Sequence, residues 1–204
     1  MLISVPASRP AFGVRLLSLL IDYALILAYL VVLGLVALGT YALTGSLFDW
    51  LSLGTGGAEL LGFVVLVLPV GVYLYLCEAS ERQATVGKRV LSLRVVDAAT
   101  GGTLSKPRVL VRTIVKLLPW EVAHFMVWQA VAVTATGATD FPVWLTVGMV
   151  VANVLPLLYI GMVLFQKDRR GPHDLIAGSK VIRTRDGGAA GDIMIDGLAH
   201  ARSR

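Results

Sequence analysis

The sequence predicts an all-α membrane protein, a four-transmembrane-helix bundle with both termini cytoplasmic and a small cytoplasmic β-hairpin or sheet. The 204-residue chain is 56% hydrophobic, with a mean hydropathy of +0.78, which is more apolar surface than a soluble domain of this length needs. The apolar residues fall in long runs rather than in the period of a soluble helix or strand. The positive charges are confined to one set of loops.

Four apolar runs are candidates for membrane spans. They cover residues 16–43, 60–77, 118–136 and 142–165. A helix rises about 1.5 Å per residue, so about 20 residues cross the hydrocarbon core. The first run is longer than this and is too long for the core of a signal peptide, so we expect a retained helix that tilts or protrudes. The third run is marginal because it contains Glu121 and His124.

The positions of Lys and Arg predict the topology. Of the 18 basic residues, two precede the first run or start it, eight lie between the second run and the start of the third, and eight follow the fourth. The segments 44–59 and 137–141 contain none, only Asp49, Glu59 and Asp140. Because positive charge marks the cytoplasmic side, the pattern predicts four spans with both termini in the cytoplasm.

The net charge of +5 is explained by these basic loops. Such loops attract anionic lipid headgroups, which we expect as partners at the cytoplasmic face. Nucleic-acid binding typically combines basic residues with exposed aromatics, and residues 78–113 contain no aromatic, so we expect no nucleic-acid partner. The single cysteine, Cys77, excludes an intrachain disulfide and indicates no metal framework. We expect neither a metal nor a cofactor.

The chain divides into a cytoplasmic N-terminal segment 1–14, a membrane domain 15–184 and a glycine-containing, flexible tail 185–204. Within the domain, the cytoplasmic segment 84–118 is the most patterned part. Residues 90–97 are β-branched and partly alternating, and a turn with two glycines follows, which predicts a short hairpin that resumes at Thr103-Leu104.

A cationic helix is expected after this hairpin. Ser105 is a candidate cap and Pro107 a typical first helical residue. Arg108, Arg112 and Lys116 repeat every four residues and share one face. We expect an amphipathic helix that lies at the membrane surface or enters it, with its junction to the third span at Pro119-Trp120. Residues 179–185 predict a strand that can pair with 90–97.

Asp22 is the one acidic residue in the first apolar run. A carboxylate in hydrocarbon costs about 2.5–3.5 kcal/mol on insertion scales, so it needs a partner. Arg15 lies on nearly the same helix face but leans away from Asp22, which disfavours a direct pair. The candidate partners are Arg112, Lys116, His124 and the cluster 169–174. Asp22 is either a structural contact that fixes helix register or a site for a proton or a cation.

Two further groups carry titratable side chains. Glu121 and His124 lie at i and i+3, a spacing found in metal sites, but the chain lacks the partner ligands, and a structural hydrogen-bonded pair is the favoured interpretation. His173-Asp174 lies beside Arg169 and Arg170. A structural loop, a charge relay and a catalytic pair are the alternatives there, and no nucleophile motif accompanies them.

Several separated motifs resemble the RDD family of small bacterial membrane proteins. They are Arg15 before the first span, Asp22 within it, TVGKRVLSLRVVD at 85–97, LSKPRVLVRTIVKLL at 104–118 and RRGPHDLIAG at 169–178. The family is named for one arginine and two aspartates, which the resemblance places at Arg15, Asp22 and Asp174. It implies a multi-pass protein of the bacterial cytoplasmic membrane. Transport has been suggested for the family, and cation/proton exchange for some members.

Two hypotheses follow. In the first, a proton, a cation or a small ligand is transported at Asp22, and because four helices enclose little volume, this requires a homo-oligomer. In the second, the chain is a non-catalytic accessory or scaffolding subunit of a larger membrane complex that docks through its cytoplasmic face. An enzyme at His173-Asp174 is disfavoured. The candidate binding residues are Arg15, Asp22, Arg112, Lys116 and Asp174, supported by Arg169, Arg170, His173, Glu121 and His124.

Overall fold

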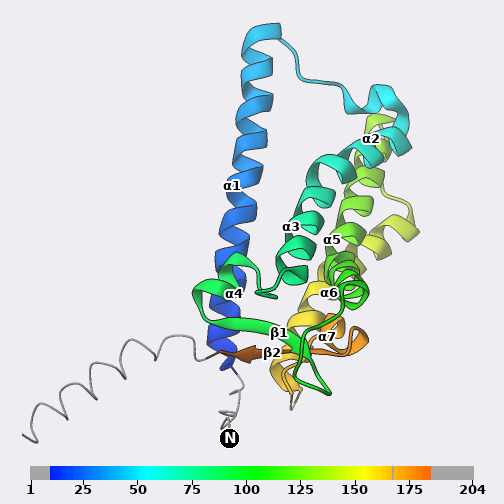
Figure 1. Cartoon of the computed structure of the whole chain (residues 1–204). Coiled ribbons are helices and arrows are strands. Elements are labelled where there is room, and N and C mark those ends of the chain that lie inside the picture. Colours follow the sequence, from blue (N-terminus) through cyan, green and yellow to red (C-terminus); the bar gives the residue numbers. More distant parts are fainter. Residues whose placement is uncertain (1–9, 167, 185–204) are drawn as a thin grey trace, which may run out of the picture.

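The computed structural model describes residues 10–166 and 168–184, so most of the predicted N-terminal segment and the tail 185–204 lie outside the described residues. A long first helix stands beside a group of three helices, and all of them meet a small sheet at one end (Figure 1). We call this end, formed by α4, α7, β1 and β2, the sheet end. The helices are α1 (Phe12–Thr44), α2 (Gly54–Gly62), α3 (Leu68–Ala79), α4 (Val86–Val90), α5 (Lys106–Ala135), α6 (Val143–Phe165) and α7 (Pro172–Ile176).

Three helical segments of the described chain are long and apolar enough to cross a membrane. They are Phe12–Thr44, Trp50–Ala79 and Val143–Phe165. The predicted spans 16–43, 60–77 and 142–165 fall within or close to these segments. The fourth, 118–136, falls in α5, which is too polar to qualify. The mostly helical architecture with a two-stranded sheet is therefore confirmed, and the apolar helices indicate a multi-pass membrane protein.

The segment Trp50–Ala79 is helical but irregular. It begins with the 3-10 turn η1 (Trp50–Leu53), and the π-helical turn η2 (Phe63–Val67) separates α2 from α3. Pro69 has no N–H to bond the carbonyl of Val65 four residues earlier. The hydroxyl of Tyr29 in α1 donates to this carbonyl at 2.6 Å.

α5 uses the same device. It is one continuous helix with Pro119 inside it, so the predicted cationic helix and the predicted third span join at Pro119-Trp120 without an intervening loop. Pro119 has no N–H for the carbonyl of Val115, and the hydroxyl of Tyr159 in α6 donates to that carbonyl at 2.9 Å. In both helices, a tyrosine hydroxyl from a neighbouring helix thus donates to the backbone carbonyl that a proline leaves without its helical donor. This reduces the free-energy cost of the missing helical hydrogen bond.

The sheet pairs β1 (Leu93–Asp97) with β2 (Ser179–Arg183) in antiparallel register, Leu93 opposite Arg183 and Asp97 opposite Ser179. The predicted pairing of these two segments is confirmed. The predicted hairpin is wrong, because Asp97 accepts hydrogen bonds from the backbone of Ala99 and Thr100 and closes a turn, after which the chain leads into α5 without a returning strand.

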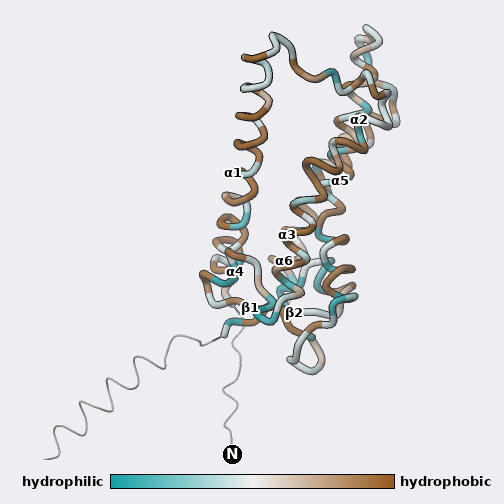
Figure 2. The backbone as a smooth tube through the Cα atoms, turned by 45° about the horizontal axis from the view of Figure 1, so that its top comes forward, coloured by the Kyte–Doolittle hydropathy of each residue, from teal (hydrophilic) through white to brown (hydrophobic). Residues whose placement is uncertain are grey.

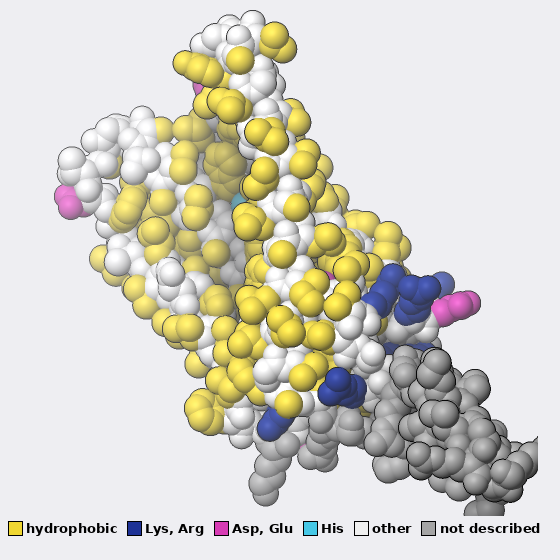
Figure 3. Space-filling model, turned by 90° about the vertical axis from the view of Figure 1, so that its left-hand side faces the viewer, with side chains coloured by type: hydrophobic (Ala, Val, Ile, Leu, Met, Phe, Trp, Pro, Cys, Tyr) yellow, Lys and Arg dark blue, Asp and Glu magenta, His cyan; other side chains and the backbone are white. Residues whose placement is uncertain are grey.

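The hydrophobic core also lies at the sheet end. Leu93, Val95, Leu104, Val109 and Val181 form one buried cluster. Apolar residues line the helices and hydrophilic ones gather around β1 and β2 (Figure 2). The face that α1 presents is covered by hydrophobic side chains along its length, with Lys and Arg near one end (Figure 3). Large apolar side chains such as Leu35, Leu38 and Leu157 are more than 60% exposed, as lipid-facing residues are.

Candidate functional site

Asp22 lies 5% exposed on the sheet-end half of α1. Its Oδ1 accepts from the hydroxyl of Tyr73 at 2.8 Å and from the backbone N–H of Gly87 at 2.9 Å. Its Oδ2 accepts from the hydroxyl of Thr85 at 2.6 Å. The three donors are neutral and come from α3 and from the start of α4. They join α1 to both.

Gly87 permits this approach. A Cβ at position 87 would lie 2.0 Å from the backbone carbonyl oxygen of Ser18 and 3.1 Å from Cγ of Asp22. Only glycine lets the first turn of α4 rest directly on α1. The backbone N–H of Gly87 belongs to the first turn of α4 and has no partner within the helix, so it is free to bond the carboxylate.

Glu78, in the last turn of α3, collects three cations. Its side chain is 0% exposed. Nζ of Lys88 and Nζ of Lys116 each lie 2.8 Å from its Oε1, and Nη1 of Arg112 donates to its Oε2. Nζ of Lys88 also reaches the hydroxyl of Thr85 at 3.4 Å, which connects Glu78 with Asp22 through two side chains. A buried carboxylate needs such compensation, because removal from water disfavours its charge.

Arg112 continues the chain of contacts to Asp174 in α7. Its Nε and Nη2 lie 3.1 and 2.9 Å from Oδ1 of Asp174. The other oxygen, Oδ2, accepts from Nη2 of Arg15 at 3.1 Å. Burial alone would raise the pKa of Asp174, but the guanidinium groups of Arg112 and Arg15 hold it well below its usual range. Asp174 therefore remains a carboxylate at every physiological pH.

These contacts form one continuous set of side chains, which we call the sheet-end network. It contains four basic residues, three acidic residues and one hydroxyl, contributed by α1, α3, α5, α7 and the segment around α4. Its members are Arg15, Asp22, Glu78, Thr85, Lys88, Arg112, Lys116 and Asp174.

Comparison with known protein families shows to which family the chain belongs. The RDD family matches residues 9–178, which is most of the chain and includes every member of the network. The chain belongs to the RDD family. No curated protein and no solved structure shows significant similarity to it.

The structure brings five of the predicted residues of this RDD protein into the network, namely Arg15, Asp22, Arg112, Lys116 and Asp174. The cationic and imidazole partners expected for Asp22 are wrong: its carboxylate accepts from Tyr73, Thr85 and Gly87. Arg112 and Lys116 are directed to Glu78 instead. Arg15 pairs with Asp174 rather than with Asp22, in keeping with the direction in which helical side chains lean.

The supporting residues Arg169 and Arg170 hold backbone. Nη1 of Arg169 donates to the carbonyl of Pro10, and the carbonyl of Arg169 accepts from Arg15. Nε of Arg170 donates to the carbonyl of Ser179 at 2.9 Å and its Nη2 to that of Asp174 at 3.2 Å. Both arginines therefore fix the loop around α7 and do not extend the network with charge.

His173 is a buried neutral imidazole beside the network. Its Nε2 lies 3.6 Å from Oδ2 of Asp174, and its ring stacks on Tyr159 at a centroid distance of 6.3 Å. Burial lowers the pKa of His173 to about 3, although the carboxylate of Asp174 acts in the opposite direction. His173 packs α7 against α6. A charge relay or catalysis at His173-Asp174 has no further support in its contacts.

Four network or donor residues were missed by sequence reasoning: Tyr73, Glu78, Thr85 and Lys88. Glu78 had a usable signal, because it is a carboxylate at the end of an apolar run. Lys88 lies in the glycine–lysine–arginine motif that resembles a phosphate loop only superficially. Tyr73 and Thr85 carry no charge, and although Thr85 opens the motif at 85–97, nothing in the spacing of either residue indicates a carboxylate partner.

Glu121 and His124 lie outside the sheet-end network, further along α5. Nδ1 of His124 is 3.6 Å from Oε2 of Glu121. His124 accepts a hydrogen bond from Nε1 of Trp128 at 2.9 Å on its other nitrogen. Across residues 10–166 and 168–184 no group of three or more metal-ligating side chains comes together.

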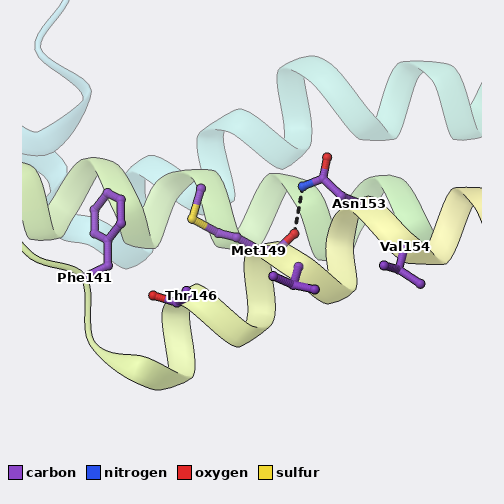
Figure 4. A pocket seen from close by; sticks show the side chains of 6 residues that line it. Phe141, Thr146, Met149, Asn153 and Val154 are labelled. Atoms are coloured by element: carbon purple, nitrogen blue, oxygen red, sulfur yellow. Dashed lines mark hydrogen bonds between the residues drawn. The ribbon is translucent and has the colours of Figure 1, made fainter.

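Two surface grooves of the described chain are apolar, and no member of the network lines either of them. One, of about 390 Å³, lies along α6 and is lined by Phe141, Met149 and Val154 among others (Figure 4). Asn153 in this groove donates to the carbonyl of Met149 in its own helix at 2.8 Å, so its amide is engaged. The other, of about 440 Å³, follows α1 and ends at Trp120. Both suit acyl chains or a neighbouring helix better than a polar ligand.

Proposed function

We propose that this RDD family protein acts in transport across the bacterial cytoplasmic membrane, with four spans and both termini in the cytoplasm. Asp22 is the residue that takes up a proton or a small cation, and the sheet end faces the cytoplasm. The observation that supports this most strongly is the sheet-end network: three buried carboxylates from separate helices in a chain of apolar helices. Ionisable groups at such positions are costly and are functional candidates by default.

Asp22 differs from the other two carboxylates in its partners. Glu78 touches three cations and Asp174 touches two, so neither has a place for a further positive charge. The donors to Asp22 among the described residues, Tyr73, Thr85 and Gly87, are neutral. A carboxylate offers about four acceptor sites, and these three donors leave one, on Oδ2. A proton or a small cation added there would not compete with a fixed positive charge.

α1 is the element that such an event would move. Its polar attachments are the contacts of Arg15 and Asp22 at the sheet end and the bond from Tyr29 to Val65. The half beyond Tyr29 is lined with exposed apolar side chains, for example Leu35 and Leu38, and stands apart from the other helices (Figure 1). This half would lie against a second copy of the chain, which gives the enclosed path that one four-helix bundle lacks.

The alternative is an accessory subunit of a membrane complex. It is supported by the same exposed faces of α1 and α6, which a partner helix would cover, and by the basic cytoplasmic segments, which would dock a soluble domain. In this case the charges of the network are structural.

Reconstitution separates the two. The purified protein is placed in liposomes that enclose a pH-sensitive dye, and gradients of Na⁺ and K⁺ are applied. Transport predicts a cation-dependent change of internal pH that is absent from protein-free liposomes. An accessory role predicts no flux from the lone protein together with a stoichiometric membrane partner after mild solubilisation.

A further inference from the structure

A second polar group lies along α5, remote from the sheet-end network; the side chain of His124 is buried and that of Glu121 is 38% exposed. Glu121, His124 and Trp128 follow one face of α5 at i, i+3 and i+7. His124 is about 12 Å along the helix from Lys116, at 1.5 Å per residue. Two of its atoms are buried without a hydrogen-bond partner: Nδ1 of His124 and Oε2 of Glu121. They lie 3.6 Å apart, slightly beyond hydrogen-bond distance, and face each other.

The bond to Trp128 determines the protonation of the imidazole. Nε1–H of Trp128 donates to Nε2 of His124 at 2.9 Å, so Nε2 presents a lone pair. The proton of the neutral ring must therefore reside on Nδ1, on the side of the Glu121 carboxylate. A second proton can only enter at Nε2, and it would turn that nitrogen into a donor and break the bond from Trp128.

The rings of His124 and Trp128 lie close to Gly62, at the irregular part of the segment Trp50–Ala79. A Cβ at Gly62 would lie 2.7 Å from both Nε2 of His124 and Nε1 of Trp128, so only glycine admits this contact. Gly62 directly precedes the π-helical turn η2, and such turns recur at functional sites. Trp128 in turn packs on Trp50 of η1, with ring centroids 5.7 Å apart.

Few other charges face this group. Of the elements that pack against α5, η2 contains no ionisable side chain, α6 contains Tyr159 and α2 contains Glu59. α3 and α7 also pack against α5 and carry Tyr73, Tyr75, Cys77, Glu78, His173 and Asp174; Glu78 and Asp174 are paired with Arg112 in the sheet-end network. On α5 itself the nearest are Glu121 and, one and a half turns before it, Lys116. The hydroxyl of Tyr29 in α1 is engaged with the carbonyl of Val65 in η2. Glu121 is therefore the carboxylate in position to stabilise a positive imidazole.

We propose that Glu121 and His124 form a proton-binding site on α5 where it packs against Gly62, and that Trp128 changes its contacts when the site is filled. Binding adds one proton to Nε2 of His124. The imidazolium then donates from Nδ1 to Oε2 of Glu121, closing the 3.6 Å gap, and Trp128 is released towards Trp50. The sheet-end network has no part in this step, so a test of this site does not depend on whether Asp22 acts in transport.

The test follows Trp128 in the full-length chain. Trp50, Trp120 and Trp144 are replaced by Phe, which keeps an aromatic ring against Trp128 and leaves one indole. The fluorescence of this protein in nanodiscs is recorded between pH 4 and 9. We expect a single transition that disappears in His124→Gln, since glutamine accepts the Trp128 bond but does not titrate. Glu121→Gln should move the midpoint, because the carboxylate that faces Nδ1 of His124 is then replaced by a neutral amide.

His173→Gln is the matched control. It should leave the transition intact, because His173 lies in α7 at the sheet end, remote from His124. The proposal is overturned if the parent shows no transition, if His124→Gln retains it, or if Glu121→Gln leaves the midpoint unchanged. Both glutamine variants are close in shape to the residues they replace. In size-exclusion chromatography each variant should elute at the volume of the parent, which shows that it is folded.

Discussion

Two nitrogen atoms of Arg112 donate to one oxygen of Asp174, Nε at 3.1 Å and Nη2 at 2.9 Å. The third nitrogen of the same guanidinium reaches Glu78 in α3. One fully buried side chain of α5 therefore joins α3 and α7, and its planar shape suits two carboxylates better than a lysine would. The sheet end of this RDD protein is held by charge at the place where its helices leave the apolar zone.

Glu78→Gln should destabilise the fold strongly. The change leaves Lys88, Lys116 and Arg112 close together without their shared counter-charge. Breaking a buried pair by removing one partner costs about 3–5 kcal/mol. Thermal unfolding in detergent checks this, with Glu81→Gln, an exposed position three residues on, as control. Equal melting temperatures for the two variants would show that the network does not stabilise the fold.

Gly87→Ala should separate α4 from α1. Its Cβ would lie 2.0 Å from the carbonyl oxygen of Ser18, which is backbone and cannot turn away. The N–H of residue 87 would then lose Asp22 as acceptor. Gly34→Ala, in α1 with nothing within 4 Å, is the control and should be neutral or slightly stabilising. Cysteine cross-linking between α1 and α4 measures the separation, and an unchanged cross-linking yield in Gly87→Ala would refute the close approach.

Tyr159→Phe should cost about 1–3 kcal/mol, the range for a buried acceptor left without its donor. The acceptor is the carbonyl of Val115, which lacks a helical donor because residue 119 is proline. Pro119→Ala restores that N–H. In the Pro119→Ala background the same Tyr159→Phe change should cost less than about 0.5 kcal/mol, since the two sites are coupled. Additive costs in a double-mutant cycle of unfolding free energies would contradict this account of the tyrosine.

Acid should destabilise the protein through His173. Its pKa is lowered from 6.5 to about 3 by burial, so the unfolded chain binds a proton there that the folded chain does not. The stabilisation is complete above pH 6.5 and is lost as the pH falls from 6.5 towards 3. Asp174 adds its own loss only at lower pH, because its folded pKa lies well below its usual range.

The measurement is the free energy of unfolding between pH 6.5 and 4. Its slope should be smaller in His173→Gln than in the parent, because glutamine does not titrate. An identical slope in both proteins would show that His173 is not buried in its neutral form.

The spans were predictable because lipid-facing helices need apolar residues on every side. The first and last, expected at 16–43 and 142–165, are found as Phe12–Thr44 and Val143–Phe165. The second begins earlier than expected, at Trp50, because its glycine-rich start at 54–57 resembles a loop. The predicted hairpin failed because turn residues after a strand do not specify which segment pairs with it. β1 pairs with a strand more than 80 residues away.

The candidate site was predictable in part. Asp22 was identifiable because a lone carboxylate in an apolar run must have partners. The partners were not, because Tyr73, Thr85 and the backbone of Gly87 are neutral and lie 51 to 65 residues from it. Charge patterning directs attention to Arg112 and Lys116, whereas the fold directs those cations to Glu78. The choice among acceptors depends on tertiary packing, which no local pattern encodes.

The proposal that Asp22 takes up the transported proton or cation is tested most directly by removing its charge. Asp22→Asn keeps the shape of the side chain and its contacts with Gly87 and Tyr73 nearly intact. Asp140→Asn, in the exposed loop between α5 and α6, is the matched control. Both are reconstituted beside the parent in liposomes with an internal pH dye and Na⁺ or K⁺ gradients. We predict cation-dependent proton flux from the parent and from Asp140→Asn, and none from folded Asp22→Asn. Equal flux from all three, or no flux from the parent, would contradict the proposal and leave Asp22 as a contact that fastens α1 to α3 and α4.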